Sequence, residues 1–444
     1  MKNSRGILPA ILCIALCLSM LAGCSSAPKT AVGASSASGS EPITLTVWFS
    51  DIQASESALP EEEWNINKFA RRFEQENPGV TVNIVYQADQ SVAQSKLKAE
   101  VAAGTAPDIV NTYSGFLVTS YKDIFADITQ YVPASDLEEL TGWSGVRENM
   151  DPEGAILGYP EAGSELGMFL YNKELVANAG VDLSGEGAPK NAEEFKAALI
   201  KIRDAGIQPI IADNGGFNSL WMFATGAWWT QMSGSARVMS NSTAKTSFSD
   251  DENFIKTLDF TASLYAEGLV NEDYSSCPDA LQKFYNGEGA MFPTGNWDVA
   301  ASLEAMGDNL GIYCIPSFDG KVDDIQIGGV GQSWSVLKSC KNPEMAVKFL
   351  SYVNSKEYVI AQAAFTGKVP QRKNLTAEEI GWAGSDVYET ILKYSDGVVI
   401  WNDNALQVDV ANEYYTRTGM VIIGQITAAE CAQQLDEIAA DAAN

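Results

Sequence analysis

Residues 73–82, Phe-Glu-Gln-Glu-Asn-Pro-Gly-Val-Thr-Val, contain the turn that decides the fold of this sequence. Asn77-Pro78-Gly79 is a helix-stopping run, and it follows a helical pattern over residues 64–75. In that pattern the apolar side chains recur at the spacing of one helix face: Ile66, Phe69, Ala70 and Phe73. After the turn, apolar residues alternate from Val80 to Tyr86, which predicts a strand.

The same order of elements continues on both sides of this turn. Residues 43–49 alternate as a strand, residues 91–104 predict a second helix, and residues 107–110 predict a short buried strand. A β-α-β-α-β order is typical of a parallel sheet covered by helices, so the fold class is α/β. Further strand segments are expected at 158–160, 168–171 and 207–212, and further helices after Asn191, Asn342 and Thr427.

Composition excludes several classes of chemistry. The 444 residues include no histidine, which rules out Ser-His-Asp and Cys-His catalytic sites and any His-ligated metal. The 29 Lys and Arg against 57 Asp and Glu give a net charge of −28, which disfavours nucleic acid as a partner. The GxxxxGK[ST] phosphate-binding motif is missing as well. We therefore expect no cofactor and no metal.

The first residues predict export and anchoring. Lys2 and Arg5 precede an apolar run that is short for a membrane span, so residues 1–23 are interpreted as a signal peptide. Leu21-Ala22-Gly23-Cys24 resembles a bacterial lipobox, which implies cleavage before Cys24 and attachment of a lipid to its sulfur. The alternative is an ordinary secretory peptide with an incidental cysteine. Residues 24–40 are rich in Ser, Ala and Gly and predict a flexible tether.

Four cysteines remain beyond this segment, at positions 277, 314, 340 and 431. Their spacing contains no CxxC element, so a metal cluster is not expected. An even number outside the cytoplasm permits disulfides, but the spacing does not define the pairing. Cys314 and Cys431 lie in apolar patterns, which predicts buried thiols for those two.

Several motifs in order along the chain carry a family resemblance. They are 43–48, 73–82, 104–110 (Gly-Thr-Ala-Pro-Asp-Ile-Val), 158–160 (Gly-Tyr-Pro), 170–175 (Leu-Tyr-Asn-Lys-Glu-Leu), 284–291 (Phe-Tyr-Asn-Gly-Glu-Gly-Ala-Met), 295–297 (Gly-Asn-Trp), 328–331 (Gly-Gly-Val-Gly) and 367–370 (Gly-Lys-Val-Pro). With this set the chain resembles the extracellular solute-binding proteins of bacterial ABC importers, in the carbohydrate-binding family related to maltodextrin-binding protein. Most of these motifs also serve as turns and strand starts, so they do not identify the solute.

The resemblance implies a two-lobe, type II periplasmic-binding-protein-like fold. Each lobe is expected to be a mainly parallel sheet flanked by helices, with a hinge between the lobes. The expected N-terminal lobe comprises 41–155 plus 296–338, and the C-terminal lobe comprises 156–295 plus 339–444. The resemblance also implies a monomer at the outer face of the cell membrane that closes around a carbohydrate and then docks on membrane permease subunits.

Sugar binding requires flat apolar faces and planar hydrogen-bonding groups, and ligands of open α/β sheets bind beyond the carboxyl ends of the strands. Trp64 and Trp143 are interpreted as core residues. Trp401 precedes Asn-Asp-Asn, and this pattern assigns it neither to a core nor to a binding site. The candidate ligand-binding residues are Trp48, Asp51, Gln53, Tyr113, Ser114, Glu165, Asp213, Asn214, Trp221, Trp229, Trp297, Asp298, Trp334 and Arg372.

Two alternatives stay open. A secreted glycoside hydrolase needs only two carboxylates, so the lack of histidine does not exclude it; no eightfold strand pattern of a barrel is present. The same two-lobe fold also accommodates a non-sugar solute such as a polyamine, which suits an acidic cleft with aromatic rings.

Overall fold

The structure is a computed structural model that describes residues 41–50, 52, 54–88, 90–214, 219–320, 326–395 and 398–443. The expected signal peptide, tether and lipid-bearing Cys24 lie outside these residues, as do the candidate ligand-binding residues Asp51 and Gln53. Within the described ranges, every helix is too short or too polar to cross a bilayer.

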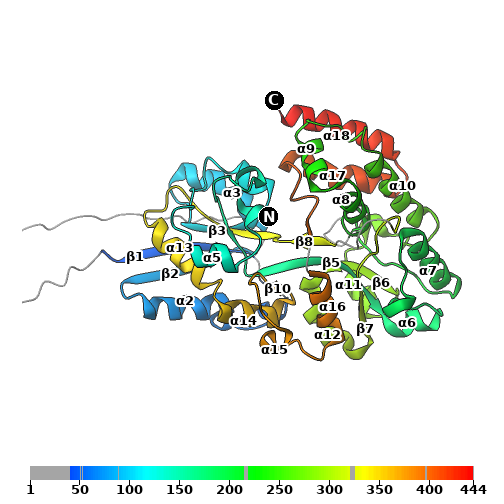
Figure 1. Cartoon of the computed structure of the whole chain (residues 1–444), viewed down its shortest axis with the longest axis horizontal. Helices are drawn as coiled ribbons and strands as arrows, with labels where there is room; N and C mark the ends of the chain where they lie inside the picture. The colour runs from blue at the N-terminus through cyan, green and yellow to red at the C-terminus, as the bar shows by residue number, and fades with distance from the viewer. Residues whose placement is uncertain are drawn as a thin grey trace, which may run out of the picture. The chain divides into compact units, whose positions relative to one another are not determined.

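The first sheet contains the elements around the opening turn (Figure 1). Its strand order is β2-β1-β3-β9-β4, with β1 parallel to both β2 and β3, and β9 antiparallel to β3 and β4. The bounds are β1 Ile43–Phe49, β2 Val80–Tyr86, β3 Ile109–Tyr113, β4 Tyr159–Pro160 and β9 Gln332–Val336. The strands predicted over 43–49 and 80–86 are therefore confirmed, residue for residue.

The second sheet is built around one long strand. Strand β5 pairs antiparallel with β10 and β8 near its start and with β6 and β7 further along, and β11 is added parallel to β8. The bounds are β5 Gly163–Asn172, β6 Met291–Gly295, β7 Leu310–Tyr313, β8 Ile327–Gly329, β10 Val369–Pro370 and β11 Val399–Ile400. The expectation of a mainly parallel sheet in each lobe is thus wrong for this one, because β5 runs against its neighbours.

Helices cover both sheets, and each sheet with its helices is called a lobe from here on. The first lobe carries α1 Ala54–Ser57, α2 Asn65–Glu76, α3 Gln90–Ala103, α4 Phe116–Ser120, α5 Ala134–Glu139, α13 Pro343–Tyr352 and α14 Lys356–Thr366. The second lobe carries α6 Lys173–Asn178, α7 Ala192–Asp204, α8 Ala227–Ser233, α9 Ser235–Ser242, α10 Glu252–Ala266, α11 Ala280–Tyr285, α12 Val299–Met306, α15 Ala377–Ile380, α16 Asp386–Ser395, α17 Val408–Ile422 and α18 Ala428–Ala442. Both lobes belong to the compact unit Pro42–Asn444.

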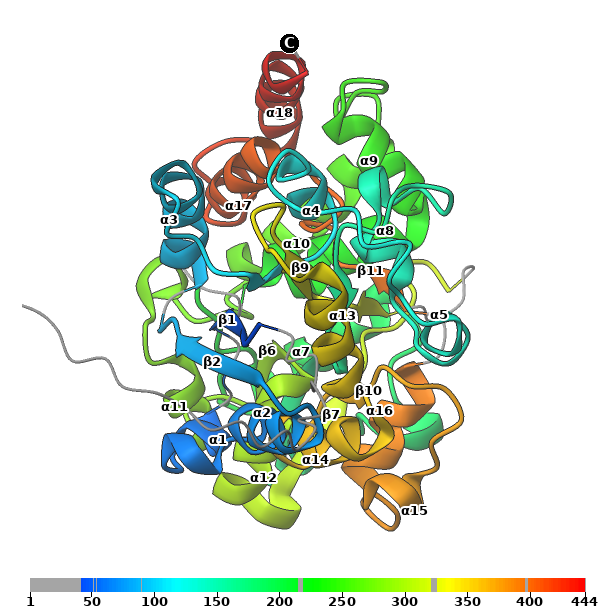
Figure 2. The same cartoon turned by 90° about the vertical axis from the view of Figure 1, so that its left-hand side faces the viewer.

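The helix starts follow the capping residues in the sequence. Asn191 accepts a hydrogen bond from the Glu194 N–H at 2.9 Å, and Thr427 forms a full capping box with Glu430. In the first lobe, the stripe of α2 that ends in Phe73 packs against α13, with the Phe73 and Phe349 rings 5.3 Å apart. Figure 2 shows α2, α13 and α14 on the outer face of this lobe.

The chain passes between the sheets at three described points: from β4 to β5, from β8 to β9, and from α14 to β10. The expected lobe limits put 296–338 in the first lobe, yet α12, β7 and β8 in that range belong to the second lobe. They put residues after 339 in the second lobe, yet α13 and α14 pack on the first sheet. The apolar faces of these two helices are buried in the hydrophobic core of the first lobe.

One predicted strand is almost absent. Residues 207–212 form no named strand, and only Ile210 makes parallel bridges, to Val270 and Met291. The segment is nevertheless buried, with Ile210, Ile211 and Ala212 at 2% exposure or less. The apolar run at 207–212 therefore correctly predicted burial, but it did not predict that the segment lacks a continuous ladder of strand hydrogen bonds.

The four remaining cysteines are buried thiols outside any disulfide, as predicted for Cys314 and Cys431. Burial raises the pKa of the Cys340 thiol to about 12 and that of Cys431 to about 12. The thiolate is the reactive form of cysteine. Both thiols are therefore unreactive at neutral pH, because reagents cannot reach them and because they stay protonated.

We predict that Cys340 and Cys431 resist iodoacetamide at pH 8 in the folded protein and react once guanidinium unfolds it. An unfolded thiol ionises near pH 8.5, so unfolding raises both its exposure and its thiolate fraction. Peptide-level mass spectrometry distinguishes the sites from the other cysteines. Labelling of Cys431 at the same rate in both states would contradict this structure.

Candidate functional site

A cavity of about 290 Å³ lies between the lobes and takes its walls from both. The first lobe supplies residues of α3 and of the segment from β3 through α4, and the second supplies the loop after β11 and the start of α17. Figure 2 shows α3, α4 and α17 gathered at one end of the molecule. The lining residues are Gln94, Ser95, Tyr113, Ser114, Leu117, Tyr121, Asp403, Asn404, Leu406, Val408, Ala411, Asn412 and Tyr415.

The first wall is positioned by the carboxyl end of β3. This strand ends at Tyr113, and Ser114 then donates its N–H to the Gly331 carbonyl at 3.0 Å and its hydroxyl to the Val330 carbonyl at 2.5 Å. The pair predicted as ligand-side residues, Tyr113 and Ser114, therefore does line the cavity. Their contact with a solute stays a prediction.

Tyr121 completes the first wall. Its hydroxyl donates to the Gln94 carbonyl at 3.3 Å, and its ring stacks on Phe125 with 5.5 Å between centroids. Burial raises the pKa of Tyr121, so the phenol stays protonated at neutral pH. The ring is held by its neighbours, and α3 is tied to α4 through it.

The second wall is centred on Asp403. Its Oδ2 accepts the Tyr415 hydroxyl at 3.0 Å, and its Oδ1 accepts the Asn404 N–H at 3.0 Å. Burial raises the pKa of Asp403, and these two hydrogen bonds, together with one from the backbone N–H of Asp403 itself, oppose that rise. The Tyr415 ring in turn lies against Trp221, with centroids 4.5 Å apart.

Asn404 joins the two walls. It donates from Nδ2 to the Ser114 hydroxyl oxygen at 2.9 Å and to the Gly331 carbonyl at 3.2 Å, and its own carbonyl accepts the Phe116 N–H at 3.0 Å. Gly115 makes this approach possible: its φ is +74°, and a Cβ there would lie 2.1 Å from the Asn404 oxygen. The lobes are therefore in direct contact beside the cavity.

A buried ion cluster links two of the crossings. The Lys368 ammonium, on the α14–β10 crossing, lies 3.3 Å from a Glu161 oxygen and 3.2 Å from a Glu165 oxygen. Glu161 follows β4 in the first sheet, whereas Glu165 lies in β5 of the second. Gly163 allows the close approach, because a Cβ there would lie 2.6 Å from Lys368 Cβ. Glu165, a predicted ligand residue, is thus part of the crossing and does not line the cavity.

Asn296 connects the same two crossings by hydrogen bonds. Its Nδ2 donates to the Ser164 carbonyl at 3.0 Å and to the Gly367 carbonyl at 3.2 Å, and its Oδ1 accepts the Leu166 N–H at 3.0 Å. All three partners are backbone groups at the start of β5 or just before β10. A side chain that satisfies three backbone groups in this way fixes one segment against the other.

The predicted tryptophans lie mostly in cores. Trp229 is fully buried and donates its indole N–H to Asp251 at 2.9 Å, and Trp334 is 3% exposed and stacks on Phe49. Trp48 is half-buried and packs against the core beneath α3. An indole that is covered and has an internal hydrogen-bond acceptor is a core side chain. Trp229, with its internal acceptor, and Trp334, by its burial, thus lie in cores and not among the cavity's lining residues; their contact with a solute stays a prediction.

Trp221 and Asn214 lie behind the second wall. Trp221 is 3% exposed and touches Tyr415, as described, while the Asn214 side chain lies against Gly419, one turn further along α17. Both side chains therefore support the helix that carries Tyr415 and do not line the cavity. Asp213 is half-buried next to Asn214.

Three further predicted residues lie outside the cavity walls. Trp297 packs between Phe223 and Trp401, with ring centroids 6.3 and 5.7 Å away. Asp298 accepts the Thr294 hydroxyl at 2.5 Å at the start of α12, and burial raises its pKa. Arg372 donates to the Asn354 carbonyl at 3.1 Å and pairs with Glu139, so it ties the chain after β10 to the first lobe.

Sequence reasoning missed the second wall. Asp403, Asn404, Asn412 and Tyr415 carry its polar atoms, and none of them was selected. The available signal was the run Trp401-Asn-Asp-Asn, in which a large aromatic precedes polar residues outside any periodic pattern.

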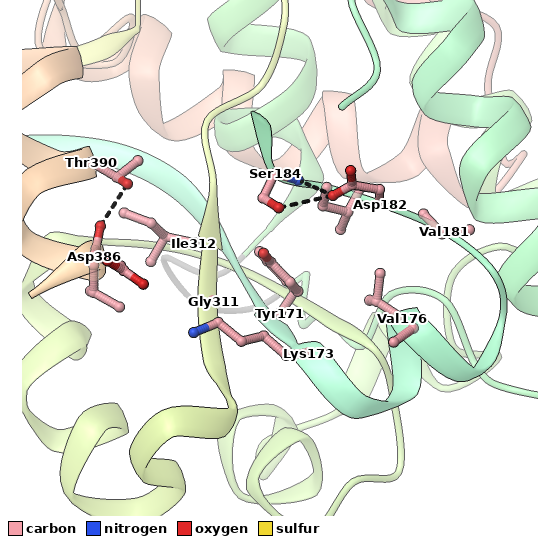
Figure 3. Close-up of a pocket in the computed structure, with 13 residues that line it drawn as sticks. Tyr171, Lys173, Val176, Val181, Asp182, Ser184, Gly311, Ile312, Asp386 and Thr390 are labelled. Atoms are coloured by element: carbon pink, nitrogen blue, oxygen red, sulfur yellow. Dashed lines mark hydrogen bonds between the residues drawn. The ribbon is translucent and has the colours of Figure 1, made fainter. Parts of the chain in front are cut away.

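A second cavity, of about 300 Å³, lies at the outer end of the second lobe (Figure 3). Tyr171, near the end of β5, lies close to Ser184 and Asp182, while the Lys173 side chain, at the start of α6, extends toward Gly311 and Asp386 lies on the opposite side. The Asp182 carboxylate accepts both the N–H and the hydroxyl of Ser184, at 2.8 and 2.9 Å. All of its lining residues belong to the second lobe, so a solute in this cavity would not bridge the two lobes.

The chemistry available between the lobes is recognition. The walls offer phenol rings, amides, hydroxyls and one carboxylate. Within the described part of the chain, no three acidic or thiol side chains come together as a metal site. The arrangement suits a polyhydroxylated solute that is held from two sides.

Comparisons with known proteins agree with this geometry. Residues 60–360 match the family model described as bacterial extracellular solute-binding protein. A lactose-binding protein of Rhizobium radiobacter is 22% identical over 361 residues, which cover 77% of this chain and 79% of that protein. Among solved structures, a chitin oligosaccharide binding protein matches with a TM-score of 0.76 and 21% identity, over 90% of this chain and 99% of that one. The sugar-binding protein MalE from Xanthomonas citri matches with a TM-score of 0.70 and 20% identity, over 90% and 98%. These likenesses confirm the predicted two-lobe α/β fold.

We predict that Lys368→Met lowers the free energy of unfolding by about 3–5 kcal/mol, because it removes a buried ammonium that pairs with the largely covered carboxylates of Glu161 and Glu165. Urea unfolding followed by circular dichroism measures the change. Lys356→Met is the matched control, since Lys356 pairs with Glu379 on the surface; its midpoint should stay close to that of the wild type. Equal effects of the two substitutions would count against a structural role for the buried cluster.

Proposed function

Since this chain belongs to the bacterial extracellular solute-binding proteins, we propose that it captures a mono- or oligosaccharide between its two lobes and delivers it to the permease of an ABC importer. After cleavage before Cys24, a lipid on that cysteine would hold the protein at the outer face of the membrane, as the lipobox-like run suggests. The protein would act as a monomer and leave the sugar chemically unchanged. The matched family and the similar structures are binding proteins, which supports that role over the glycoside hydrolase alternative.

The cavity between the lobes carries the proposal. Tyr113 and Tyr415 come from opposite lobes and offer aromatic surface for the C–H face of a pyranose. Asn412, Ser95 and Asp403 add planar and hydroxyl groups that bond sugar hydroxyls. The similar proteins include a lactose-binding protein and a chitin oligosaccharide binding protein, which supports the same class of solute.

A cationic solute is the second candidate, and Asp403 is the observation that favours it. A polyamine ammonium would pair with this carboxylate and lie against the tyrosine rings. The neutral amides and hydroxyls that make up the rest of the polar lining suit a sugar better, because a polyamine offers few groups for them.

We predict that at least one neutral sugar raises the melting temperature of the protein, whereas spermidine does not. A ligand at 100 times its Kd adds about 2.7 kcal/mol of stability. Differential scanning fluorimetry over mono- and oligosaccharides, with spermidine and amino acids as comparison solutes, tests this. A response to spermidine alone would replace the sugar proposal with the cationic one.

We also predict that the bound sugar reduces the radius of gyration. The solute bridges the two walls and favours the form in which they face each other closely. Small-angle scattering with and without a saturating amount of the sugar identified by fluorimetry measures the change. An unchanged radius at saturation would contradict closure while leaving binding intact.

A further inference from the structure

The cavity between the lobes has an unbalanced charge. Asp403 is its one charged lining residue among the residues that the structure describes, and neither lysine nor arginine belongs to that lining. Lys98, an exposed residue outside the lining, has its Nζ 5.2 Å from the centre of the Tyr121 ring. A solute in this cavity therefore meets a carboxylate without a lining cation beside it.

The carboxylate of Asp403 retains capacity to accept hydrogen bonds. Tyr415 donates to one oxygen and the Asn404 N–H to the other, and the backbone N–H of Asp403 itself also bonds to the carboxylate. An ionised carboxylate accepts at about four positions, so a solute in the cavity can use those that remain. Asp403 is half-buried as a residue and lines the cavity.

The two kinds of sugar meet this carboxylate differently. A neutral sugar hydroxyl donates a proton to it and forms a charge-assisted hydrogen bond. A uronic acid would instead bring a second carboxylate into a partly desolvated space, where like charges repel and neither has a paired cation. The chain's net charge of −28 adds a field of the same sign.

We infer that Asp403 makes the cavity selective for uncharged sugars and excludes the corresponding uronic acids. This inference rests on the proposed function. Tyr415 is a positioning residue in this scheme, because it holds the Asp403 carboxylate in place by its hydroxyl.

The test compares wild-type protein with Asp403→Asn, which keeps the size of the side chain and removes its charge. Fluorimetry first screens two matched panels: glucose, galactose, xylose and their oligomers, and glucuronate, galacturonate and their oligomers. Calorimetry then gives a Kd for each sugar that binds. Asp386→Asn is the control, since it makes the same change on an exposed residue at the outer cavity of the second lobe.

The wild type should bind members of the neutral panel and not their uronic acid counterparts. In Asp403→Asn the ratio of the two affinities should narrow by roughly tenfold or more, because the neutral sugar loses a charged acceptor and the acid loses a repulsion. Asp386→Asn should leave the ratio unchanged. Tyr415→Phe should weaken neutral binding and keep the exclusion of acids.

Three results would overturn the inference. Wild-type binding of a uronic acid within tenfold of its neutral partner would remove the selectivity. An equal loss of both affinities in Asp403→Asn, with the melting temperature lowered, would make Asp403 merely structural. Binding of no sugar from either panel would overturn the proposed function itself, and the selectivity with it, so the two failures are distinguishable.

Discussion

The backbone pairing of β5 is the constraint on which the rest of the molecule depends. Its first residues pair with β8 and β10, and its later residues lie between β6 and β7. Strand β4 leads into β5, β8 leads into β9, and α14 leads into β10, so one short ladder gathers all three described crossings. Lys368 and Asn296 reinforce that ladder with buried polar contacts. The opposing walls of the cavity are held in register by this junction.

Much of the fold was predictable because local signals agree with it. Strand periodicity located 43–49 and 80–86, and capping residues located the starts of α7, α13 and α18. The strand directions of the second sheet were not predictable, because β5 pairs with segments more than a hundred residues away that carry short, continuous apolar runs. The lobe limits failed for the same reason, since an apolar helix face does not say which sheet it covers.

The site divides in the same way. The rule that ligands bind beyond the carboxyl ends of strands brought Tyr113 and Ser114 to the cavity wall. Asp403 and Tyr415 stand about 290 residues further along the chain, on a loop and a helix whose approach to β3 depends on tertiary packing. The tryptophans were selected as ligand-binding residues because polar residues neighbour them in the sequence. That pattern is equally typical of a tryptophan in a core. For Trp229 an internal acceptor on Asp251 decided for the core.

The buried thiols have a consequence for how the protein matures. Proteins of this family work outside the cytoplasm, where exposed thiols become oxidised. Within the described chain no disulfide joins Cys277, Cys314, Cys340 or Cys431, and each lies in the interior. These four cysteines therefore add no covalent cross-link to the native state, and their thiols are exposed to oxidation until the cores around them have formed. Burial within each lobe's core, in place of a disulfide, is what keeps these thiols from oxidants in the folded protein.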